Sequence, residues 1–319
     1  MSWMVTGGAG YIGSHVVRAF GEAGIDVVVL DDLSSGHRDY VPDGVPFVET
    51  SLLDTPAVTA ALREHGVTGV VHLAGFKYAG VSVREPLHTY TQNVTGTVSL
   101  LEAMVAAGVG NLVFSSSAAT YGTPRTDLVT ETTATSPESP YGESKLIGEW
   151  LIADAGRAHG IRHTSLRYFN VVGSGTTQLA DTSPHNLFPL VIKALSEGRT
   201  PRINGEDYAT PDGTNVRDYV HVVDLATSHV SAAQALEGGR ELERVYNLGS
   251  GDGLSVRQIM DAFAAATGQD FTPEIGPRRA GDPDRIVADG TLAARDIDWA
   301  MRHTVTDMVA SAWAARPRD

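Results

Sequence analysis

Short apolar runs alternate with longer segments of helical apolar spacing along the first half of the chain. Apolar positions three to four residues apart indicate helices, whereas short apolar runs that end at glycine or polar residues indicate buried strands. The pattern predicts strands at 3–6, 26–30, 45–48, 69–73, 111–115 and 163–168. It predicts helices at 14–20, 55–65, 86–107 and 140–158. Strands that alternate with helices are typical of a parallel, doubly wound, Rossmann-like α/β sheet.

The regular alternation ends after residue 170. Residues 173–184 are rich in Gly, Ser, Thr and Pro and are expected to form a loop, followed by a helix that ends at Glu197. Further helical segments are expected at 291–298 and 304–315. We therefore expect a sheet domain over residues 1–169, which also takes in part of 215–240. A smaller mixed α/β domain is expected over 170–319.

Composition narrows the class of protein. A net charge of -14 gives little electrostatic support for binding nucleic acid. The chain has no cysteine, so disulfides and thiolate metal sites are excluded, and its 11 histidines show no ligand spacing that indicates a metal. The first strand starts too early for a signal peptide, and no apolar run reaches the ~20 residues of a membrane span. We expect a soluble cytoplasmic protein.

A glycine-rich turn joins the first expected strand to the first expected helix. Its sequence is Gly7-Gly8-Ala9-Gly10-Tyr11-Ile12-Gly13. Glycines at such a turn let the backbone approach a pyrophosphate, and the start of the helix supplies N–H groups and partial positive charge. Because the glycines stand between a strand and a helix, we predict a dinucleotide site.

Two acids end the second strand and select the type of dinucleotide. A carboxylate at this place accepts hydrogen bonds from the hydroxyls of the adenosine ribose. Asp31 and Asp32 would also repel a 2′-phosphate, and the nearest cation is Arg38. NAD is therefore predicted in preference to NADP.

Polar residues follow several strands, where ligands of such a sheet bind. Lys77, Ser115–Ser117 and 168–170 all lie at strand ends. Tyr141 and Lys145 stand four residues apart at the start of a helix, so their β-carbons lie about 5–6 Å apart on one face. A cation beside a phenol favours the phenolate and lowers its pKa toward that of a proton-transfer catalyst. We predict that Tyr141 transfers a proton.

Several motifs together carry a family resemblance. The glycine turn, Asn93, Ser115–Ser117 and Tyr141-Gly-Glu-Ser-Lys145 resemble the extended short-chain dehydrogenase/reductase superfamily. Three further segments resemble its UDP-glucose (UDP-galactose) 4-epimerase family from Met1 to about Trp313. They are His72-Leu-Ala-Gly-Phe-Lys77, Leu166-Arg-Tyr-Phe-Asn170 and Asp212-Gly-Thr-Asn-Val-Arg-Asp-Tyr-Val-His221.

The resemblance implies an NAD-binding first domain and a reaction in two hydride steps. Tyr141 would take the proton of the sugar 4-hydroxyl while NAD accepts hydride from C4, and the 4-ketosugar would turn before hydride returns. Lys145 would set the pKa of Tyr141 and anchor the nicotinamide ribose, and Ser117 would bond to the sugar. The residues implied for the cofactor are Gly7, Gly10, Tyr11, Ile12, Gly13, Asp31, Asp32, Leu33, Ser34, Ser35, Gly36, Ser51, Leu52, Leu73, Ala74, Gly75, Lys77, Asn93, Ser115, Tyr141, Lys145 and Phe169.

The second domain is implied to bind a UDP-sugar. Arg217 and Arg279 would clamp the diphosphate, because the planar guanidinium pairs with phosphate oxygens and stays charged. Asp282 would receive the uridine ribose hydroxyls. The residues implied for the substrate are Lys77, Ser117, Tyr141, Asn170, Asn186, Leu187, Ile203, Asn204, Arg217, Arg279 and Asp282.

Three positions depart from the family pattern. Ser51 stands where an aspartate often reaches the adenine, and Asn204 stands where an aromatic residue stacks on uracil. Ile286 occupies a position where bulk restricts N-acetylated sugars, and it is neither small nor aromatic. The sugar range therefore stays open between UDP-hexoses, UDP-N-acetylhexosamines and UDP-pentoses.

Rival functions on the same fold differ in a few residues. Dehydratases and decarboxylases of the superfamily carry an acid just after the hydroxyl residue, where this chain has Ala118 and Ala119. A non-catalytic NAD sensor would typically have lost Tyr141 or Lys145. A net alcohol dehydrogenase that uses free NAD would share Tyr141 and Lys145, but Arg217 and Arg279 favour a UDP-sugar, on which a net NAD-dependent dehydrogenase or reductase is the remaining alternative. We expect an epimerase, and a homodimer that pairs helices 86–107 and 140–158.

Overall fold

A seven-stranded parallel sheet forms the centre of the larger lobe in the computed structural model, which describes residues 1–126, 128–279 and 282–317. The strand order is β11-β6-β5-β4-β1-β2-β3, and the pairings are parallel. This confirms the predicted doubly wound α/β fold. The strands are β1 (Ser2–Thr6), β2 (Asp26–Asp31), β3 (Phe47–Glu49), β4 (Val67–His72), β5 (Asn111–Ser115), β6 (Arg162–Tyr168) and β11 (Val245–Leu248).

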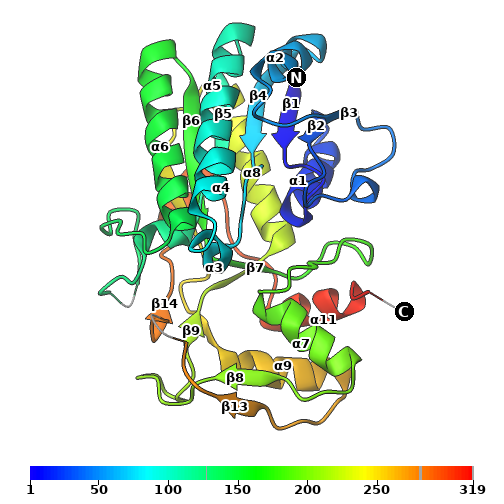
Figure 1. Ribbon diagram of the computed structural model, residues 1–319, viewed down its shortest axis with the longest axis vertical. Coiled ribbons are helices and arrows are strands. Elements are labelled where there is room, and N and C mark those ends of the chain that lie inside the picture. Colours follow the sequence, from blue (N-terminus) through cyan, green and yellow to red (C-terminus); the bar gives the residue numbers. More distant parts are fainter. Residues whose placement is uncertain (127, 280–281, 318–319) are drawn as a thin grey trace.

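Helices cover both faces of this sheet (Figure 1). Successive side chains of a strand point to opposite faces, so Trp3 and Val5 pack in one layer and Met4 in the other. The layer of Trp3 contains α1 (Tyr11–Glu22) and α8 (Val222–Glu237). The layer of Met4 contains α2 (Thr55–Glu64), α5 (Gly96–Ala107) and α6 (Pro140–His159). Both faces are therefore buried, which explains why the strands are apolar throughout.

The segment predicted as one helix at 86–107 is helical but not uniform. It consists of α4 (Pro86–Tyr90), a π-helical turn η2 (Thr91–Thr95) and α5. A π turn is a local widening that often accompanies a functional site. Here it contains Asn93, whose side chain is used outside the helix.

Helix α6 begins and ends where its sequence indicates. The Ser139 hydroxyl accepts a hydrogen bond from the N–H of Gly142 at 3.2 Å, and Pro140 takes the first helical position, where no N–H is needed. At the other end Gly160 adopts the left-handed conformation that stops a helix. Tyr141 is thereby fixed in the first turn of α6.

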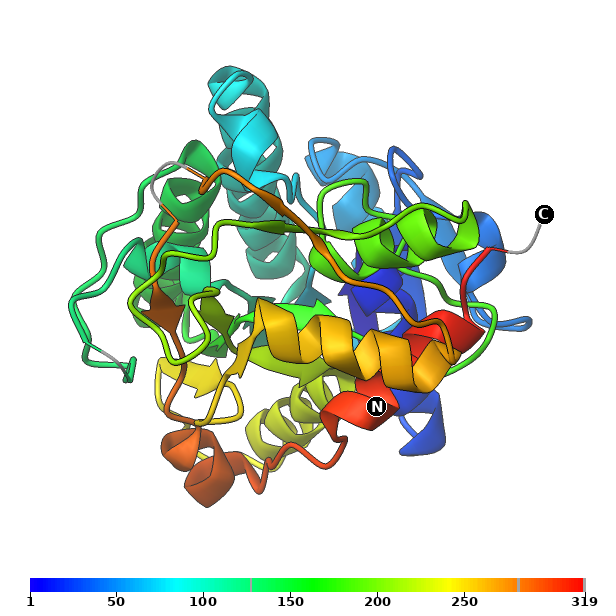
Figure 2. The same cartoon turned by 90° about the horizontal axis from the view of Figure 1, so that it is seen from below.

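The smaller lobe consists of short strands and three helices around a separate core. Helices α7 (Leu187–Ser196), α9 (Val256–Thr267) and α11 (Val305–Ala314) contribute to this core, with Phe188 against Phe263. Figure 2 shows α9 and α11 packed side by side. The strands are β7 (Asn170–Val172), β8 (Arg202–Asn204), β9 (Val216–Arg217), β10 (Tyr219–His221), β12 (Leu254–Ser255), β13 (Glu274–Gly276) and β14 (Arg285–Ile286).

The chain returns to the larger lobe after residue 170. Helix α8, strand β11 and helix α10 (Thr291–Ile297) share the core of Trp3 and Phe20. We therefore propose that the sheet domain comprises 1–169 together with α8, as expected for part of 215–240, and also β11 and α10. The remaining short elements are α3 (Ala79–Ser82), η1 (Arg38–Tyr40) and η3 (Ala118–Tyr121).

Within the described part of the chain, no helix has the length and apolar character needed to cross a membrane. The described His, Asp and Glu side chains also nowhere gather in groups of three that could hold a metal ion.

Candidate active site

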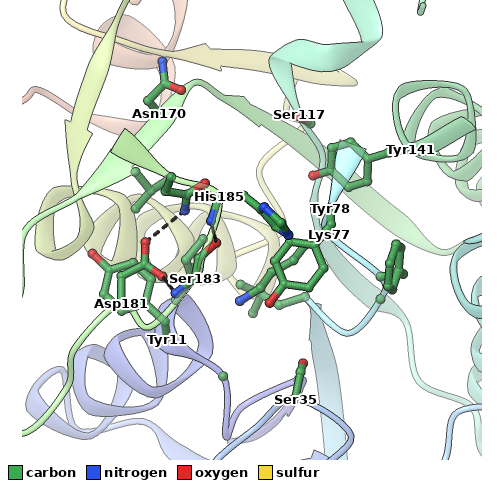
Figure 3. A pocket seen from close by; sticks show the side chains of 18 of the residues that line it. Tyr11, Ser35, Lys77, Tyr78, Ser117, Tyr141, Asn170, Asp181, Ser183 and His185 are labelled. Carbon is green, nitrogen blue, oxygen red and sulfur yellow. Dashed lines mark hydrogen bonds between the residues drawn. The ribbon is translucent and has the colours of Figure 1, made fainter. Parts of the chain in front are cut away.

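A cavity of about 750 Å³ lies at the carboxyl ends of the central strands and extends to the smaller lobe. Figure 3 shows Tyr141 and Ser117 on one side of it, and Asp181 and Ser183 on another. This is where a doubly wound sheet binds its ligands. The predicted site residues that line the cavity are Gly7, Gly10, Tyr11, Ile12, Gly13, Asp31, Asp32, Ser34, Ser35, Gly36, Leu52, Leu73, Ala74, Gly75, Lys77, Ser117, Tyr141, Lys145, Phe169, Asn170, Asn186, Leu187, Asn204, Arg217, Arg279 and Asp282.

The glycine turn forms one wall of the cavity and leaves no room for side chains. A β-carbon on Gly13 would lie 2.1 Å from the carbonyl oxygen of Gly7. Gly7 itself has a φ of 73°, which favours glycine. No side chain caps the helix that starts after Gly10, so its first N–H groups are free to bind an anion. The turn fits the pyrophosphate of a dinucleotide.

The two acids at the end of β2 hold the adjoining loops, Asp31 as its last residue and Asp32 directly after it. Asp31 is buried, and its carboxylate accepts hydrogen bonds from the N–H of Ala9 at 3.0 Å and of Leu33 at 2.9 Å. Burial raises the pKa of Asp31. Asp32 accepts from both the N–H and the hydroxyl of Ser34. Asp31 thus joins the glycine turn to the loop after β2, with free acceptor positions left for ribose hydroxyls.

Asn93 organises the loop that carries Lys77. Its amide accepts from the N–H of Phe76 at 2.6 Å and donates to the carbonyl of Phe76 at 2.9 Å. It also donates to the Ser144 hydroxyl on α6 at 2.8 Å. Asn93 is buried and does not line the cavity. It therefore fixes the Lys77 loop against the helix of Tyr141.

Tyr141 and Lys145 both face the cavity from α6. The Nζ atom of Lys145 lies 6.0 Å from the centre of the Tyr141 ring and donates to the Ser115 carbonyl at 2.9 Å. Burial lowers the pKa of Lys145 to about 8, with Glu149 acting in the opposite direction. Lys145 therefore still carries its proton at neutral pH.

The predicted lowering of the Tyr141 pKa is not what the protein's own groups produce. Burial raises the pKa of Tyr141 above 10.0, and the Ser117 hydroxyl acts against this rise. The cause is burial, which removes water from the phenol and disfavours its charged form. Charge from the bound reactants must be included to obtain the phenolate.

The three serines after β5 point in different directions. Ser117 lines the cavity, as predicted. Ser115 is fully buried, and its hydroxyl bonds to Nε2 of His229 on α8 at 2.7 Å, so its side chain does not reach the cavity. Ser116 donates to Glu149. Only the last of the three is placed to contact a sugar.

Charged and amide side chains gather at the far end of the cavity. Arg217 forms a salt bridge with Asp282, and Asn215 donates to the same carboxylate at 3.0 Å. Asn170 donates to the backbone carbonyl of Asp218 at 2.9 Å. The arrangement places guanidinium and amide groups beside a carboxylate at this end of the cavity.

Asn204, the departure from the family's aromatic residue, contacts an arginine. With its amide oxygen turned toward Arg279, Asn204 accepts hydrogen bonds from Nε and Nη2, both at 3.2 Å. Asn204 therefore orients the guanidinium of Arg279 in the cavity.

Five residues expected at the site do not line the cavity: Leu33, Ser51, Asn93, Ser115 and Ile203. The side chain of Ile203 is 1% exposed in the smaller core, and Leu33, with a φ of 57°, packs against the larger one. The Ser51 hydroxyl accepts from the N–H of Leu53 at 3.2 Å. Ile286 also lies elsewhere, buried against Tyr121 and Val129. Except for Ser115 and Ile286, these residues adjoin cavity residues in the chain, but their own side chains do not line the cavity.

Other cavity residues were not predicted. Tyr78 is in contact with His185, their rings 5.2 Å apart and nearly perpendicular, so the two lobes meet across the cavity. Tyr78 and His185 each adjoin a predicted residue, Lys77 and Asn186, and were within reach of sequence reasoning, whereas Asp181 and Ser183 lie in the expected loop at 173–184 without a motif. Tyr168, expected at a strand end, also lines the cavity. The missed residues are Leu30, Thr50, Phe76, Tyr78, His88, Gln92, Val171, Val172, Asp181, Ser183, His185, Arg202, Asn215, Tyr219 and Val256.

The chain is similar to known proteins over almost its whole length. It is 44% identical over 318 residues to the UDP-glucose 4-epimerase of Lactobacillus helveticus, covering 98% of this chain and 96% of the relative. A UDP-glucose 4-epimerase structure from Stenotrophomonas maltophila, with bound NAD and formylated UDP-arabinopyranose, has a TM-score of 0.93 and 38% identity, covering 99% and 97% of the two chains. One from Bifidobacterium longum, in complex with NAD+ and UDP, has a TM-score of 0.90 and 34% identity, covering 99% and 98%.

The family model for the NAD dependent epimerase/dehydratase family matches residues 3–249, which include the glycine turn, Tyr141 and Arg217. The chain belongs to the NAD dependent epimerase/dehydratase family.

Proposed function

We propose that the chain interconverts UDP-galactose and UDP-glucose as an NAD-dependent UDP-glucose 4-epimerase, through a transient 4-ketosugar. One observation carries the proposal: Tyr141 and Lys145 share a single cavity with the glycine turn on one side and with Arg217 and Arg279 on the other. Tyr141 and Lys145 beside the glycine turn suit a proton transfer next to a dinucleotide. Arg217 and Arg279 suit a diphosphate.

Some of these residues transfer a proton and others bind the substrate. NAD, when bound, accepts hydride from the sugar and returns it. Tyr141 takes the proton of the 4-hydroxyl at its phenolic oxygen and gives it back in the second step. Lys145, held by the Ser115 carbonyl, places a positive charge one helical turn away. Arg217 and Arg279 hold the diphosphate, so that the hexose is free to turn.

The residues next to Ser117 favour epimerisation over elimination. The short helix η3 that follows carries Ala118 and Ala119, which offer no proton-transfer group. A 4-ketosugar formed here therefore has no acid from this segment to assist loss of a neighbouring hydroxyl, and return of the hydride is the remaining path.

A stoichiometric assay tests the proposal. Purified protein is given UDP-galactose without added NAD, and both UDP-glucose and NADH absorbance are followed. We expect many turnovers to UDP-glucose with no net NADH, because each oxidation is reversed in the site. NADH that rises in step with product would identify a net dehydrogenase instead.

The sugar range is part of the same experiment. Ile286 is 8% exposed and packs against Tyr121, so it does not face the cavity from the position that restricts N-acetylated sugars in the family. UDP-N-acetylgalactosamine and UDP-pentoses are therefore assayed beside UDP-galactose. Faster turnover of either one would shift the proposal to that substrate.

We also propose a cytoplasmic homodimer, formed by the helices at 86–107 and 140–158. Three apolar side chains on these helices are exposed: Leu87 at 80%, Trp150 at 59% and Val105 at 41%. An exposed apolar patch marks an interaction surface, and the helices α4 and α5, which carry Leu87 and Val105, both pack against α6, which carries Trp150. Light scattering should give twice the chain mass, and Leu87→Glu with Trp150→Glu should give a monomer. Ile275→Glu is the matched control, at a residue of the smaller lobe that is 43% exposed. Cell fractionation tests the separate proposal that the protein is cytoplasmic.

A further inference from the structure

The face of α6 that carries Tyr141 and Lys145 continues to a third residue with a charged side chain. Glu149 stands four residues after Lys145 and is 7% exposed. Residues four apart on a helix are neighbours on one face. A buried carboxylate is costly unless it is paired, so its place beside the catalytic lysine calls for a reason. The proton transfer itself does not use it.

Arg167 and Ser116 bind this carboxylate. Nε of Arg167 donates to Oε1 of Glu149 at 2.8 Å, and Nη2 donates to Oε2 at 2.5 Å, a two-bond geometry that suits a guanidinium. The Ser116 hydroxyl donates to Oε1 at 2.5 Å. Arg167 comes from β6, is 4% exposed and lies 4.7 Å from the centre of the Tyr121 ring. The pair is fully enclosed.

Through its hydrogen bond with Ser116, Glu149 contacts the segment Ser115–Ser117 at the end of β5. Ser116 stands between Ser115, whose carbonyl accepts from Lys145, and Ser117, which lines the cavity. The Glu149 carboxylate therefore fixes the short segment that holds Lys145 from one side and presents Ser117 from the other. A shift at Ser116 would move both contacts together.

Among the groups packed around Lys145, Glu149 is the charged one that raises the pKa of the lysine. From β5, Lys145 meets the Ser115 carbonyl and the ring of Phe114, whose centre is 4.9 Å away. From β4 it faces His72, and burial lowers the pKa of His72 to about 3, so that this imidazole is neutral. On α6 the raised pKa of Tyr141 keeps that phenol neutral before the reactants bind. Glu149 opposes the effect of burial on the pKa of Lys145, while Arg167 faces Glu149 from β6.

We propose that Glu149 is a positioning residue, which keeps Lys145 charged and the Ser115–Ser117 segment in place, and that Arg167 balances its charge. The inference rests on the proposed function. It assigns to the Glu149–Arg167 pair a role in the reaction beyond packing of the core.

The test compares turnover against pH for the wild type and for Glu149→Gln, each as NAD-loaded protein with UDP-galactose. Without the carboxylate, Lys145 loses its proton at lower pH, so the alkaline limb of the profile should move down by about one pH unit. Because the pKa of Lys145 is about 8 before the change, turnover at pH 8 should fall about fivefold. Asp154→Asn, at an exposed carboxylate on the same helix that pairs with Arg157, should leave the profile unchanged.

A second variant separates the proposed role from stability. Glu149→Gln leaves Arg167 buried without its partner, which should lower the melting midpoint. The double variant Glu149→Gln with Arg167→Met removes both charges, so its alkaline limb should lie between those of Glu149→Gln and the wild type, at a melting midpoint nearer the wild type. A profile that is only scaled down, with its limbs in place, overturns the inference. Absence of epimerase turnover in the wild type would instead overturn the proposed function.

Discussion

The two lobes contribute to the same cavity by different structural means. In the larger lobe, parallel strands of three to seven residues carry site residues at their ends, one strand after another along the chain. In the smaller lobe the strands are two to three residues long, and they pair across large distances in sequence. Strand β9 lies between β12, which is antiparallel, and β14, which is parallel.

Side-chain hydrogen bonds replace long ladders in the smaller lobe. The buried carboxylate of Asp218 accepts from the N–H groups of Ser250 at 2.7 Å and Ala288 at 3.0 Å. Asp212 accepts from the N–H of Thr214 at 2.9 Å and from the Ser255 hydroxyl. The positions of Arg217 and Asp282 thus depend on single carboxylates, whereas that of Tyr141 depends on a whole helix. We expect chemistry and cofactor retention to depend on the larger lobe, and substrate affinity on the smaller one.

The largest expected effect is on chemistry in the larger lobe. Tyr141→Phe removes the proton acceptor and keeps the ring, so turnover should fall about 10³–10⁴-fold. NAD content and melting midpoint should match the wild type, because the helix and the glycine turn are untouched. Absorbance of bound NAD and circular dichroism check this. Turnover close to that of the wild type would remove Tyr141 from the mechanism.

The next effect is on cofactor retention. Gly13→Ala places a methyl group 2.1 Å from the Gly7 carbonyl oxygen, so the turn must open. Purified protein should lose most of its NAD and melt at a lower temperature. Gly21→Ala is the control, since it lies on the same helix and its new methyl has no atom within 4 Å. The free energy of unfolding of this variant should rise by up to about 1 kcal/mol. Equal NAD content in the two variants would contradict the assignment of the turn.

Substrate affinity provides a smaller effect, in the other lobe. Arg279→Ala should raise KM for UDP-galactose about 10–100-fold with less change in kcat, because a charge-assisted contact to the diphosphate is lost. Arg278→Ala is matched to it. This neighbour stacks 3.9 Å from the centre of the Tyr208 ring, pairs with Asp284 and does not line the cavity. If both variants raise KM alike, the two lobes do not divide the work as described.

The smallest effect per residue is a pH dependence of stability. Burial lowers the pKa of four histidines to between about 3 and 4, and three of them belong to the sheet and the helices that cover it. Unfolded histidines bind protons near pH 6.5 and these folded ones do not, so stability falls as pH drops below 6.5. Each of these histidines lowers the free energy of unfolding by about 1 kcal/mol at pH 5.5. The histidines are His15, His72, His221 and His229.

Thermal unfolding between pH 7.5 and 5 measures this effect. Asp31, Glu131 and Asp218 oppose it, since burial raises the pKa of these carboxyls, so that the folded state binds their protons more readily than the unfolded chain as pH falls. We expect the four histidines to outweigh these three carboxyls over this range. A melting midpoint that rises on acidification would mean that these imidazoles accept protons in the folded protein.

The sequence by itself determined the features whose causes are local. The glycine turn, the acids at the end of β2 and the Tyr141–Lys145 spacing each depend on residues a few positions apart, and the parallel sheet follows from a repeated local pattern. The bounds of β5 and the start of α6 were predicted to the residue, because apolar runs and the Ser139-Pro140 cap act over short distances.

The tertiary structure decided what depends on distant partners. Asn93 binds a loop and Ser115 binds His229, although both were expected to reach the cofactor. Local pattern does not say which neighbour a buried polar group will find. Strand β11 joins the sheet from beyond residue 240, and the loop with Asp181 reaches the cavity without any motif. The pKa of Tyr141 was the clearest case, since the pattern showed the cation, while only the fold showed how much water burial removes.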